Sequence, residues 1–432
     1  MEEDLKEILD AAVAAAEPSK TVRQVLSARD RRVKVGEESF EPQRVFALAV
    51  GKASGPMAQA VREILGEALI GGLCVVKGGH EEPPPPFETV VAGHPEPDEG
   101  SIQAAAKAED LLEELGEGDL LLVLVSGGAS ALLGDAAAGI SLEDLKTLSG
   151  ALLRSGASIG EINAVRKHVS TLKGGSLVQK AAPASIVALL LSDVVGDEPS
   201  AIGSGLTAPD PTRLEDVWQI LKRYEIEPPQ SIADHLQKGQ ETPKPGDEAF
   251  GKLSNIVVGG GRLTASAAAE KARELGYEPL LLSTHLTGNA RDVAGLHAAV
   301  VKEIFESGNP LAPPCALITG GEVTVVVRGE GTGGPNQEFA LSLAIELDGI
   351  ENWAALAIDT DGNDGPTDAA GGLVNGQTAA TIQGSGIDPR EALDANDAYR
   401  ALEAGGALVR TGPTGTNVND LRVVLVSGTP RS

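Results

Sequence analysis

The sequence is poor in aromatic residues and cysteine, and it contains no long uninterrupted hydrophobic run. Phe, Trp and Tyr together make up 3% of the 432 residues, so the core must consist mainly of Ala, Val, Leu and Ile. The two cysteines, Cys74 and Cys315, are too few for a disulfide framework or a cysteine-ligated metal site. Both lie in apolar stretches and are expected to be buried thiols. No apolar run reaches the roughly 20 residues that a membrane-spanning helix needs.

Basic residues are also scarce relative to acidic ones. The chain has 35 Lys and Arg against 62 Asp and Glu, a net charge of −27. A field of this sign repels nucleic-acid backbones and anionic lipid surfaces, so neither nucleic acid nor membrane is expected as a partner. Any site for a small anion must be locally positive or neutralised by a metal. The acidic N-terminal segment lacks the basic region of a signal peptide, which predicts a cytoplasmic location.

Apolar runs of strand length alternate with segments of helical periodicity in the first half of the chain. Strands are predicted at residues 45–50, 73–76, 90–92, 120–125 and 186–191. Continuous apolar strands separated by helices predict an α/β fold with a doubly wound, mostly parallel sheet covered on both faces. We assign this sheet to a first domain over residues 1–240.

The second half predicts another α/β domain, over residues 250–432, after a proline-rich and polar crossover at residues 227–247. Its strands are expected at residues 256–258, 279–282, 316–318, 323–327, 354–358 and 423–426. The runs at 316–318 and 323–327 predict a pair of strands that turns at Gly320-Gly321-Glu322. Such a pair would make the second sheet a mixed one.

Glycine-rich or acidic clusters follow most of these strands, at the sheet edge where α/β proteins bind ligands. Ser126-Gly127-Gly128-Ala129-Ser130 is a strand-to-helix turn whose backbone N–H groups could cradle a phosphate. It is not a Walker A loop, because no Lys follows at the required spacing. Lys52 comes directly after a strand, where its ammonium could meet an anion. A solvated loop lysine is an equally good interpretation.

The most basic stretch of this acidic chain begins at Asn163. Helical spacing puts Asn163, Arg166 and Lys167 near one side of a helix. An anion site and a solvated basic helix face explain this pattern equally well.

Two carboxylates, Asp193 and Asp197, follow the strand at residues 186–191. Hard oxygen ligands suit Mg²⁺, although Asp193 could instead accept the proton of a substrate hydroxyl, and either residue could cap a helix. Residues 359–365 lack the glycine and glutamate positions of an EF-hand, so they predict a turn or a corner for diphosphate and metal. Gly259-x-Gly261 is an incomplete dinucleotide fingerprint with no acidic residue near Ser283, which argues against NAD.

Together these motifs resemble one family, the class II glycerate kinases, whose C-terminal half is called the MOFRL domain. The resemblance covers nearly the whole chain and rests on nine motifs in order: VGKAS, GHPEPDE, LVSGGASALL, INAVRKHVSTLKGG, SDVVGDEPSAIGSGLTAPDPT, TGGE, GGPNQEFAL, DTDGNDGPTDAAG and TGPTGTNVNDL. Each motif alone is weakly specific, but their order is highly specific.

The resemblance implies transfer of the γ-phosphoryl group of ATP to D-glycerate with Mg²⁺, giving 2-phosphoglycerate. It implies two α/β domains with the site in the cleft between them. Lys52 matches the family's active-site lysine, so Lys52 and Asp193 are expected to be catalytic, and Asp193 and Asp197 to hold the metal. Substrate or phosphate contacts are expected from Ser126, Gly127, Gly128, Ala129, Ser130, Asn163, Arg166, Lys167, Arg328, Gly333, Asn336, Gln337, Thr414 and Asn417.

The chain departs from the family at one site position. Many members carry Arg in a Gly-Gly-Arg-Asn-Gln loop where this chain has Pro335. Arg328, Arg166 and Lys167 are the candidates that could supply the missing charge.

Two alternative functions stay open, an NAD(P)H-dependent hydroxypyruvate reductase and a non-catalytic nucleotide-binding protein. The expected partners are the small molecules glycerate and ATP. A monomer and a homodimer are both compatible with the sequence.

Overall fold

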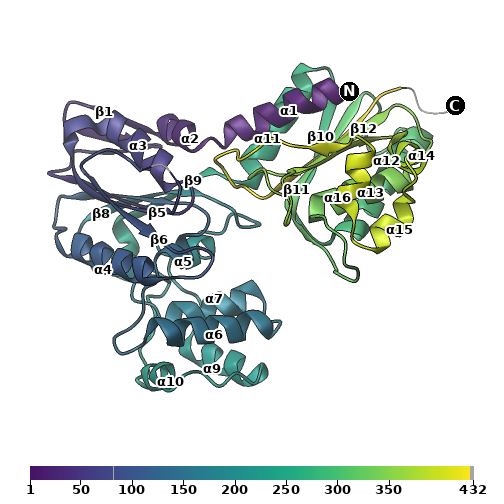
Figure 1. Cartoon of the computed structure of the whole chain (residues 1–432). Helices are drawn as coiled ribbons and strands as arrows, with labels where there is room; N and C mark the ends of the chain where they lie inside the picture. Colours follow the sequence, from purple (N-terminus) through teal and green to yellow (C-terminus); the bar gives the residue numbers. More distant parts are fainter. Residues whose placement is uncertain (81, 429–432) are drawn as a thin grey trace. The chain divides into compact units, whose positions relative to one another are not determined.

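The computed structural model describes residues 1–80 and 82–428. The chain forms two compact units. The N-terminal unit comprises Pro18–Ser192 and Asp197–Val258. The C-terminal unit comprises Met1–Glu17, Asp193–Gly196 and the chain from Gly259 onward. Both units are α/β structures, which confirms the predicted fold class (Figure 1).

The N-terminal unit is built on a six-stranded sheet of order β6-β5-β4-β7-β8-β9, whose strand pairs from β6 to β8 are parallel. Its central strands, β4 and β7, are buried along their whole length. This burial on both faces explains why their sequences are continuous apolar runs. The strands of this sheet are β4 (Val45–Val50), β5 (Leu69–Lys77), β6 (Phe87–Ala92), β7 (Leu120–Val125), β8 (Ser185–Leu191) and β9 (Leu253–Gly259).

Helices cover both faces of this sheet. Helix α3 (Ser54–Leu65) packs on β4 and β5, whereas α4 (Glu99–Glu113) packs on β5 and β6 from the opposite face (Figure 1). The expected doubly wound arrangement is therefore confirmed. A small antiparallel sheet, which the sequence does not predict, consists of β1 (Leu26–Arg29), β2 (Arg32–Val35) and β3 (Glu38–Phe40).

Further helices of the N-terminal unit form a layer with its own apolar core, to which Leu152, Val165 and Val217 contribute. This layer consists of α6 (Leu142–Arg154), α7 (Ile159–His168), α9 (Leu214–Arg223) and α10 (Gln230–Gln237). The remaining helices are α2 (Pro18–Val25), α5 (Ala129–Leu132) and α8 (Ser176–Ala181), with short 3-10 turns at Gly66–Ala68, Ile202–Ser204 and Glu248–Lys252.

The C-terminal unit contains a mixed sheet of order β10-β11-β15-β12-β13-β14. Strands β10 and β11 are parallel, and the other neighbouring pairs are antiparallel. The predicted mixed sheet is thus confirmed. Its strands are β10 (Glu278–Asn289), β11 (Cys315–Thr324), β12 (Trp353–Asp359), β13 (Gly371–Asn375), β14 (Leu408–Val409) and β15 (Asp420–Val426).

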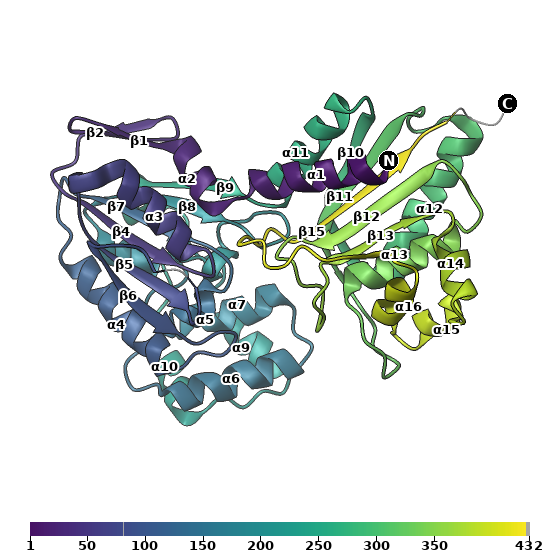
Figure 2. The ribbon, with the colours of Figure 1, turned by 45° about the horizontal axis from the view of Figure 1, so that its top comes forward.

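Successive side chains of β15 point to opposite faces of this sheet and belong to two different hydrophobic cores. Leu421, Val423 and Leu425 pack with α1 (Glu2–Ala15) and α11 (Gly261–Glu274), which lie together in Figure 2. Val424 and Val426 pack on the other face with the remaining helices. These are α12 (Ala290–Ser307), α13 (Pro335–Glu346), α14 (Thr378–Gly384), α15 (Pro389–Asp394) and α16 (Ala398–Ala404).

The units divide the chain differently from the predicted domains 1–240 and 250–432. Strand β9, expected to open the second domain, instead lies at the edge of the N-terminal sheet. Helix α1 belongs to the C-terminal unit, because its apolar residues Leu5, Ile8 and Leu9 pack with α11 and the second sheet. Both placements depend on long-range packing that local sequence patterns do not contain.

The predicted pair of strands at 316–318 and 323–327 is wrong, because β11 is one continuous strand. Gly321 has φ of +119°, and a methyl group there would lie 2.1 Å from the carbonyl oxygen of Leu286. The glycine therefore permits close approach of β10 to β11 and does not turn the chain. The predicted crossover at residues 227–247 also contains a helix, α10.

Among the described residues, no helix combines the length and the apolarity needed to cross a bilayer. Cys74 and Cys315 are buried free thiols, as expected. Burial raises the pKa of Cys74 to about 12, so this side chain is neutral at ordinary pH.

Candidate active site

The first candidate site lies where β4 and β7, the central strands of the N-terminal sheet, end. The strand order of this sheet is that of the dinucleotide-binding fold. In such sheets the chain leaves the two central strands in opposite directions, and ligands bind at this switch point. Lys52 follows β4 and Ser126–Ser130 follows β7, so the fold brings these predicted residues together.

Hydrogen bonds join the two loops at this switch point. The amide of Lys52 donates to the carbonyl of Gly127 at 2.8 Å, and the amide of Ala53 donates to Ser126 Oγ at 3.0 Å. Gly51 has φ of +128°, and a methyl group there would lie 2.1 Å from Ser126 Oγ. Gly51 is therefore required for the loops to approach this closely.

His94, for which the sequence predicts no role, also lies at this site. A methyl group on Gly128 would lie 2.8 Å from the ring of His94 and 3.5 Å from Lys52 Cγ, so these side chains flank the same glycine. Burial, followed by the charges of Lys52, Lys77 and His80, lowers the pKa of His94. A histidine with lowered pKa among cations marks a locally positive region in an acidic chain, where an anion would be favoured.

The glycine amides of the second loop are available to a ligand. Within the described part of the chain, the amides of Gly127 and Gly128 donate to no protein acceptor. Gly128 is left-handed, with φ of 84°, and precedes α5. Because α5 spans only Ala129–Leu132, its dipole contributes little, and any anion binding would depend on the amides themselves.

A chain of hydrogen bonds connects this loop to the basic helix α7. The hydroxyls of Ser130 and Ser204 are 2.9 Å apart, and Ser204 Oγ donates to Asn163 Oδ1 at 3.1 Å. The structure therefore brings Ser130 and Asn163 together through Ser204. The sequence predicts ligand contacts for Ser130 and Asn163, the two ends of this chain, but assigns no binding role to Ser204.

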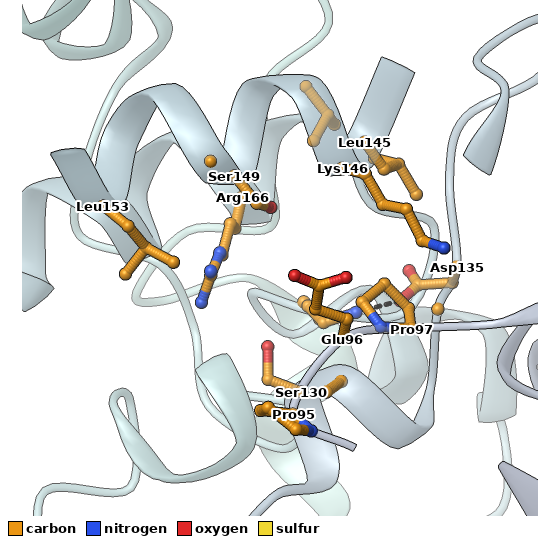
Figure 3. Close-up of a pocket in the computed structure, with 15 residues that line it drawn as sticks. Pro95, Glu96, Pro97, Ser130, Asp135, Leu145, Lys146, Ser149, Leu153 and Arg166 are labelled. Atoms are coloured by element: carbon orange, nitrogen blue, oxygen red, sulfur yellow. Dashed lines mark hydrogen bonds and ion pairs between the residues drawn. The ribbon is translucent and has the colours of Figure 1, made fainter. Parts of the chain in front are cut away.

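Arg166 lines a cavity of about 150 Å³ next to Ser130. Figure 3 shows its guanidinium with Glu96, Lys146 and Ser130 around the same space. We call this space the Arg166 cavity. Burial lowers the pKa of Arg166, and no carboxylate of the described residues lies within ion-pair distance of it. A largely buried cation without a counter-ion indicates a site for an anionic ligand.

Lys167, the neighbour of Arg166, points elsewhere. Its Nζ lies 3.3 Å from Asp210 Oδ1, and both side chains are buried. Asp210 also accepts hydrogen bonds from the hydroxyls of Thr212 and Thr242. The ammonium of Lys167 thus has a protein partner, and the structure does not bring it to the Arg166 cavity.

The second candidate site lies at the start of α13 in the C-terminal unit. The amides of Asn336 and Gln337 donate to the carboxylate of Asp364 at 3.0 and 2.8 Å. Asn336 Nδ2 donates to Asp364 at 3.2 Å and to Asp420 at 2.7 Å. The amides that could have bound a phosphate therefore bind a carboxylate of the protein. Pro335 fits this helix start, where it has no amide to satisfy.

Several carboxylates gather around this helix start. Burial raises the pKa of Asp364 to about 7, partly opposed by the bonds from Asn336 and Gln337, and raises that of Asp359 to about 8. Burial, then the charges of Asp420 and Asp193, raise the pKa of Glu322. Asp193 thus lies within electrostatic reach of Glu322.

These shifts predict how pH affects stability. An aspartate whose folded pKa is raised contributes most stability below its unfolded pKa of about 4, and this contribution is lost as pH rises through the folded pKa. In metal-free buffer, Asp359→Asn should gain about 1–3 kcal/mol more stability over wild type at pH 8.5 than at pH 5. Urea unfolding at the two pH values measures this difference. The exposed Asp348→Asn is the control, and equal effects of Asp359→Asn at both pH values would contradict the prediction.

The two predicted metal ligands fall in different units, Asp193 in the C-terminal unit and Asp197 in the N-terminal unit. Among the described residues, no group of three His, Cys, Asp or Glu side chains has an arrangement ready to hold a metal ion. Asp193, Glu322 and Asp420 nevertheless supply hard oxygen atoms in one region. Glu322 lies in the TGGE motif, which the sequence analysis used only to predict a turn.

The remaining predicted residues of the C-terminal unit lie in its loops. Thr414 Oγ1 donates to the carbonyl of Thr360, and Asn417 Oδ1 accepts from the amide of Asn419, which holds their loop against the one at Asp359–Gly362. Arg328 is exposed, with its amide bound to Asn396 Oδ1 at 2.8 Å. Gly333 packs on α16, since a methyl group there would lie 3.2 Å from Ala398.

Two family models match the chain. A domain of unknown function, DUF4147, matches residues 4–237, and the MOFRL family matches residues 315–420. The two matches follow the order of the two halves of the chain.

Individual relatives are similar over nearly their full length. A D-glycerate 2-kinase of Thermotoga maritima is 45% identical over 92% of this chain and 94% of its own. A glycerate 2-kinase of Pyrococcus horikoshii is 40% identical over 98% of each chain. A protein of Agrobacterium vitis with a provisional hydroxypyruvate reductase name is 43% identical over 98% of this chain and 94% of its own.

The crystal structure of a glycerate kinase from Thermotoga maritima matches with a TM-score of 0.89 and 42% identity. The match covers 98% of this chain and 99% of that one. Sequence and fold therefore agree with each other and with the resemblance inferred from the motifs, and this chain belongs to the glycerate kinase family that carries the MOFRL domain.

Proposed function

We propose that this protein transfers the γ-phosphoryl group of ATP to the 2-hydroxyl of D-glycerate, giving 2-phosphoglycerate and ADP. One observation carries the proposal beyond family membership. Lys52 and the unpaired amides of Gly127 and Gly128 meet at the switch point of the N-terminal sheet. In a chain with a net charge of −27, this arrangement is suited to receive phosphate.

Phosphoryl transfer depends mainly on positioning and on charge neutralisation. In this proposal Lys52 neutralises the transferring phosphoryl group, and the amides of Gly127 and Gly128 bind its oxygens. Gly51 allows the two loops to approach closely, and Ser126 joins them through a hydrogen bond. The hydrogen-bond donors are therefore fixed in place before the substrate binds. Such preorganised donors stabilise the transition state at little cost in reorganisation.

The carboxylates of Asp193 and Asp197 suit Mg²⁺ by their chemistry. Mg²⁺ prefers oxygen ligands and is held by one or two carboxylates together with phosphate and water. Asp193 and Asp197 are its proposed ligands, and the nearby Glu322 adds negative charge to the region of Asp193. When bound, the ion supplies positive charge to the triphosphate. Asp193 is alternatively the group that accepts the hydroxyl proton of glycerate.

A coupled ADP-release assay tests this function. ADP release is expected to depend on D-glycerate and to stop when EDTA is added. A non-catalytic nucleotide-binding protein would bind ATP without glycerate-dependent ADP release. In parallel, incubation with hydroxypyruvate and NADH or NADPH should leave the absorbance of the nicotinamide unchanged. Loss of that absorbance without ADP release would replace the kinase by the reductase.

A further inference from the structure

The Arg166 cavity has room for a small acid. Its volume of about 150 Å³ matches that of a protein cavity that binds benzene, so a ligand of a few heavy atoms fits it. The cavity adjoins Ser130 at the end of the phosphate loop. A ligand bound there would therefore lie beside the proposed phosphoryl group.

The charges around the cavity favour one negative charge. The cations Arg166, Lys146 and Lys173 stand against the carboxylates Glu96 and Asp135. Asp135 and Lys173 form a buried ion pair, so they neutralise each other. Arg166 and Lys146 are left with Glu96 alone, which gives the cavity one net positive charge. A single carboxylate would bring this charge to zero.

Arg166 is placed to bind that carboxylate. It projects from α7, whose Asn163 is fixed by Ser204 and whose Lys167 is fixed by Asp210. The helix therefore holds Arg166 in position while its guanidinium keeps no carboxylate partner among the described residues. A planar guanidinium binds a carboxylate with two parallel hydrogen bonds.

Glu96 is the second polar group in the cavity, and its backbone is constrained. It lies between Pro95 and Pro97, whose rings fix their φ angles. Asp98 closes the same turn, because its carboxylate accepts from the amides of Gly93 at 2.8 Å and of Ser101 at 3.0 Å. Asp98 thus has a structural role, whereas the carboxylate of Glu96 has no protein partner within the described residues and points into the cavity in Figure 3.

We propose that the Arg166 cavity is the acceptor subsite, in which Arg166 binds the carboxylate of the acid and Glu96 accepts a hydrogen bond from its second hydroxyl. This inference rests on the proposed function and adds a basis for substrate choice. An ionised carboxylate can accept but not donate, so Glu96 recognises a hydroxyl and gains nothing from a methyl group. The subsite therefore selects D-glycerate over D-lactate, which lacks only that hydroxyl.

Calorimetric titration of the full chain with D-glycerate and with D-lactate tests the subsite without requiring turnover. Wild type is expected to bind D-glycerate at least about tenfold more tightly than D-lactate, the range of a hydrogen bond to a charged group. Glu96→Ala should remove this preference, whereas Glu99→Ala, at a nearby exposed glutamate outside the cavity, should keep it. A preference that persists in Glu96→Ala would overturn the role of Glu96.

Variants of Arg166 test the carboxylate contact. Arg166→Met should weaken binding of both acids by about 100-fold, and Arg166→Lys should recover part of this loss because it keeps the charge without the paired donors. Binding of ATP should change less than twofold, and Arg31→Met, in an exposed turn, should change nothing. Wild-type affinity for D-glycerate in both Arg166 variants would overturn the subsite.

The outcomes separate the subsite from the overall function. If wild type releases ADP with D-glycerate but the Arg166 variants keep wild-type affinity, the subsite is wrong and the kinase remains. If D-glycerate binds through Arg166 but no ADP is ever released, the subsite remains and the kinase is wrong.

Discussion

Replacement of Lys52 by alanine should lower kcat by about 100- to 1,000-fold, the effect of removing one preorganised donor from a transition-state site. The fold should be unaffected, because the hydrogen bonds of residue 52 to the second loop and to His80 use its backbone. Steady-state kinetics with ATP and D-glycerate measure the loss, and circular dichroism checks the fold.

The size of this effect depends on the position of Lys52 and not on total charge. Lys34→Ala removes the same charge from an exposed strand of the small sheet and should leave kcat unchanged. Lys52→Arg should recover only part of the rate, since the guanidinium places its donors differently. Unchanged kinetics in Lys52→Ala would remove this residue from the site.

Replacement of Asp135 by asparagine should lower the free energy of unfolding by about 3–5 kcal/mol, the cost of breaking a buried ion pair by removing one partner. Asp135 is fully enclosed and accepts from the amides of Thr171 and Leu172 at 2.7 and 2.8 Å, as well as from Lys173 and Ser170. Burial alone would raise its pKa, but Lys173 and these bonds hold the pKa below its usual value. Urea unfolding followed by circular dichroism measures the loss.

A second variant separates the lost charge from the lost packing. In Asp135→Asn, Lys173 stays buried without a counter-charge, so the double variant Asp135→Asn/Lys173→Met should be more stable than the single variant. Asp110→Asn, on the exposed face of α4, should change stability by less than about 0.5 kcal/mol. If Asp135→Asn unfolds like this control, the pair contributes nothing.

Much of the N-terminal sheet could be predicted because its strands are buried on both faces. Residues 45–50 and 120–125 are uniformly apolar, and the structure ends both strands at the predicted residues. The loops that follow them could also be placed together, since carboxyl ends of parallel strands lie at one edge. This reasoning required no knowledge of which strands are neighbours.

The division into units could not be predicted in the same way. Strand β9 and helix α1 have ordinary local patterns, and their placement depends on contacts with distant parts of the chain. Gly320-Gly321 looked like a turn, because sequence alone cannot distinguish a glycine that turns the chain from one that admits a neighbouring strand.

The different roles of polar residues that are adjacent in the sequence could not be predicted from their spacing along a helix either. Arg166 and Lys167 are adjacent in the sequence, yet one lines a cavity and the other pairs with Asp210, 43 residues away. Glu96 and His94 lie in a motif that the resemblance identified without assigning roles. Their importance follows from the cations and loops around them, which only the fold assembles.

Phosphorus NMR of the product formed from ATP, Mg²⁺ and D-glycerate tests the central claim most directly. The account predicts one new phosphomonoester signal, that of 2-phosphoglycerate, which grows in proportion to ADP. It also predicts that the signal grows about 100- to 1,000-fold more slowly with Lys52→Ala and at the wild-type rate with Lys34→Ala. A signal for 3-phosphoglycerate, or inorganic phosphate alone, would contradict the account.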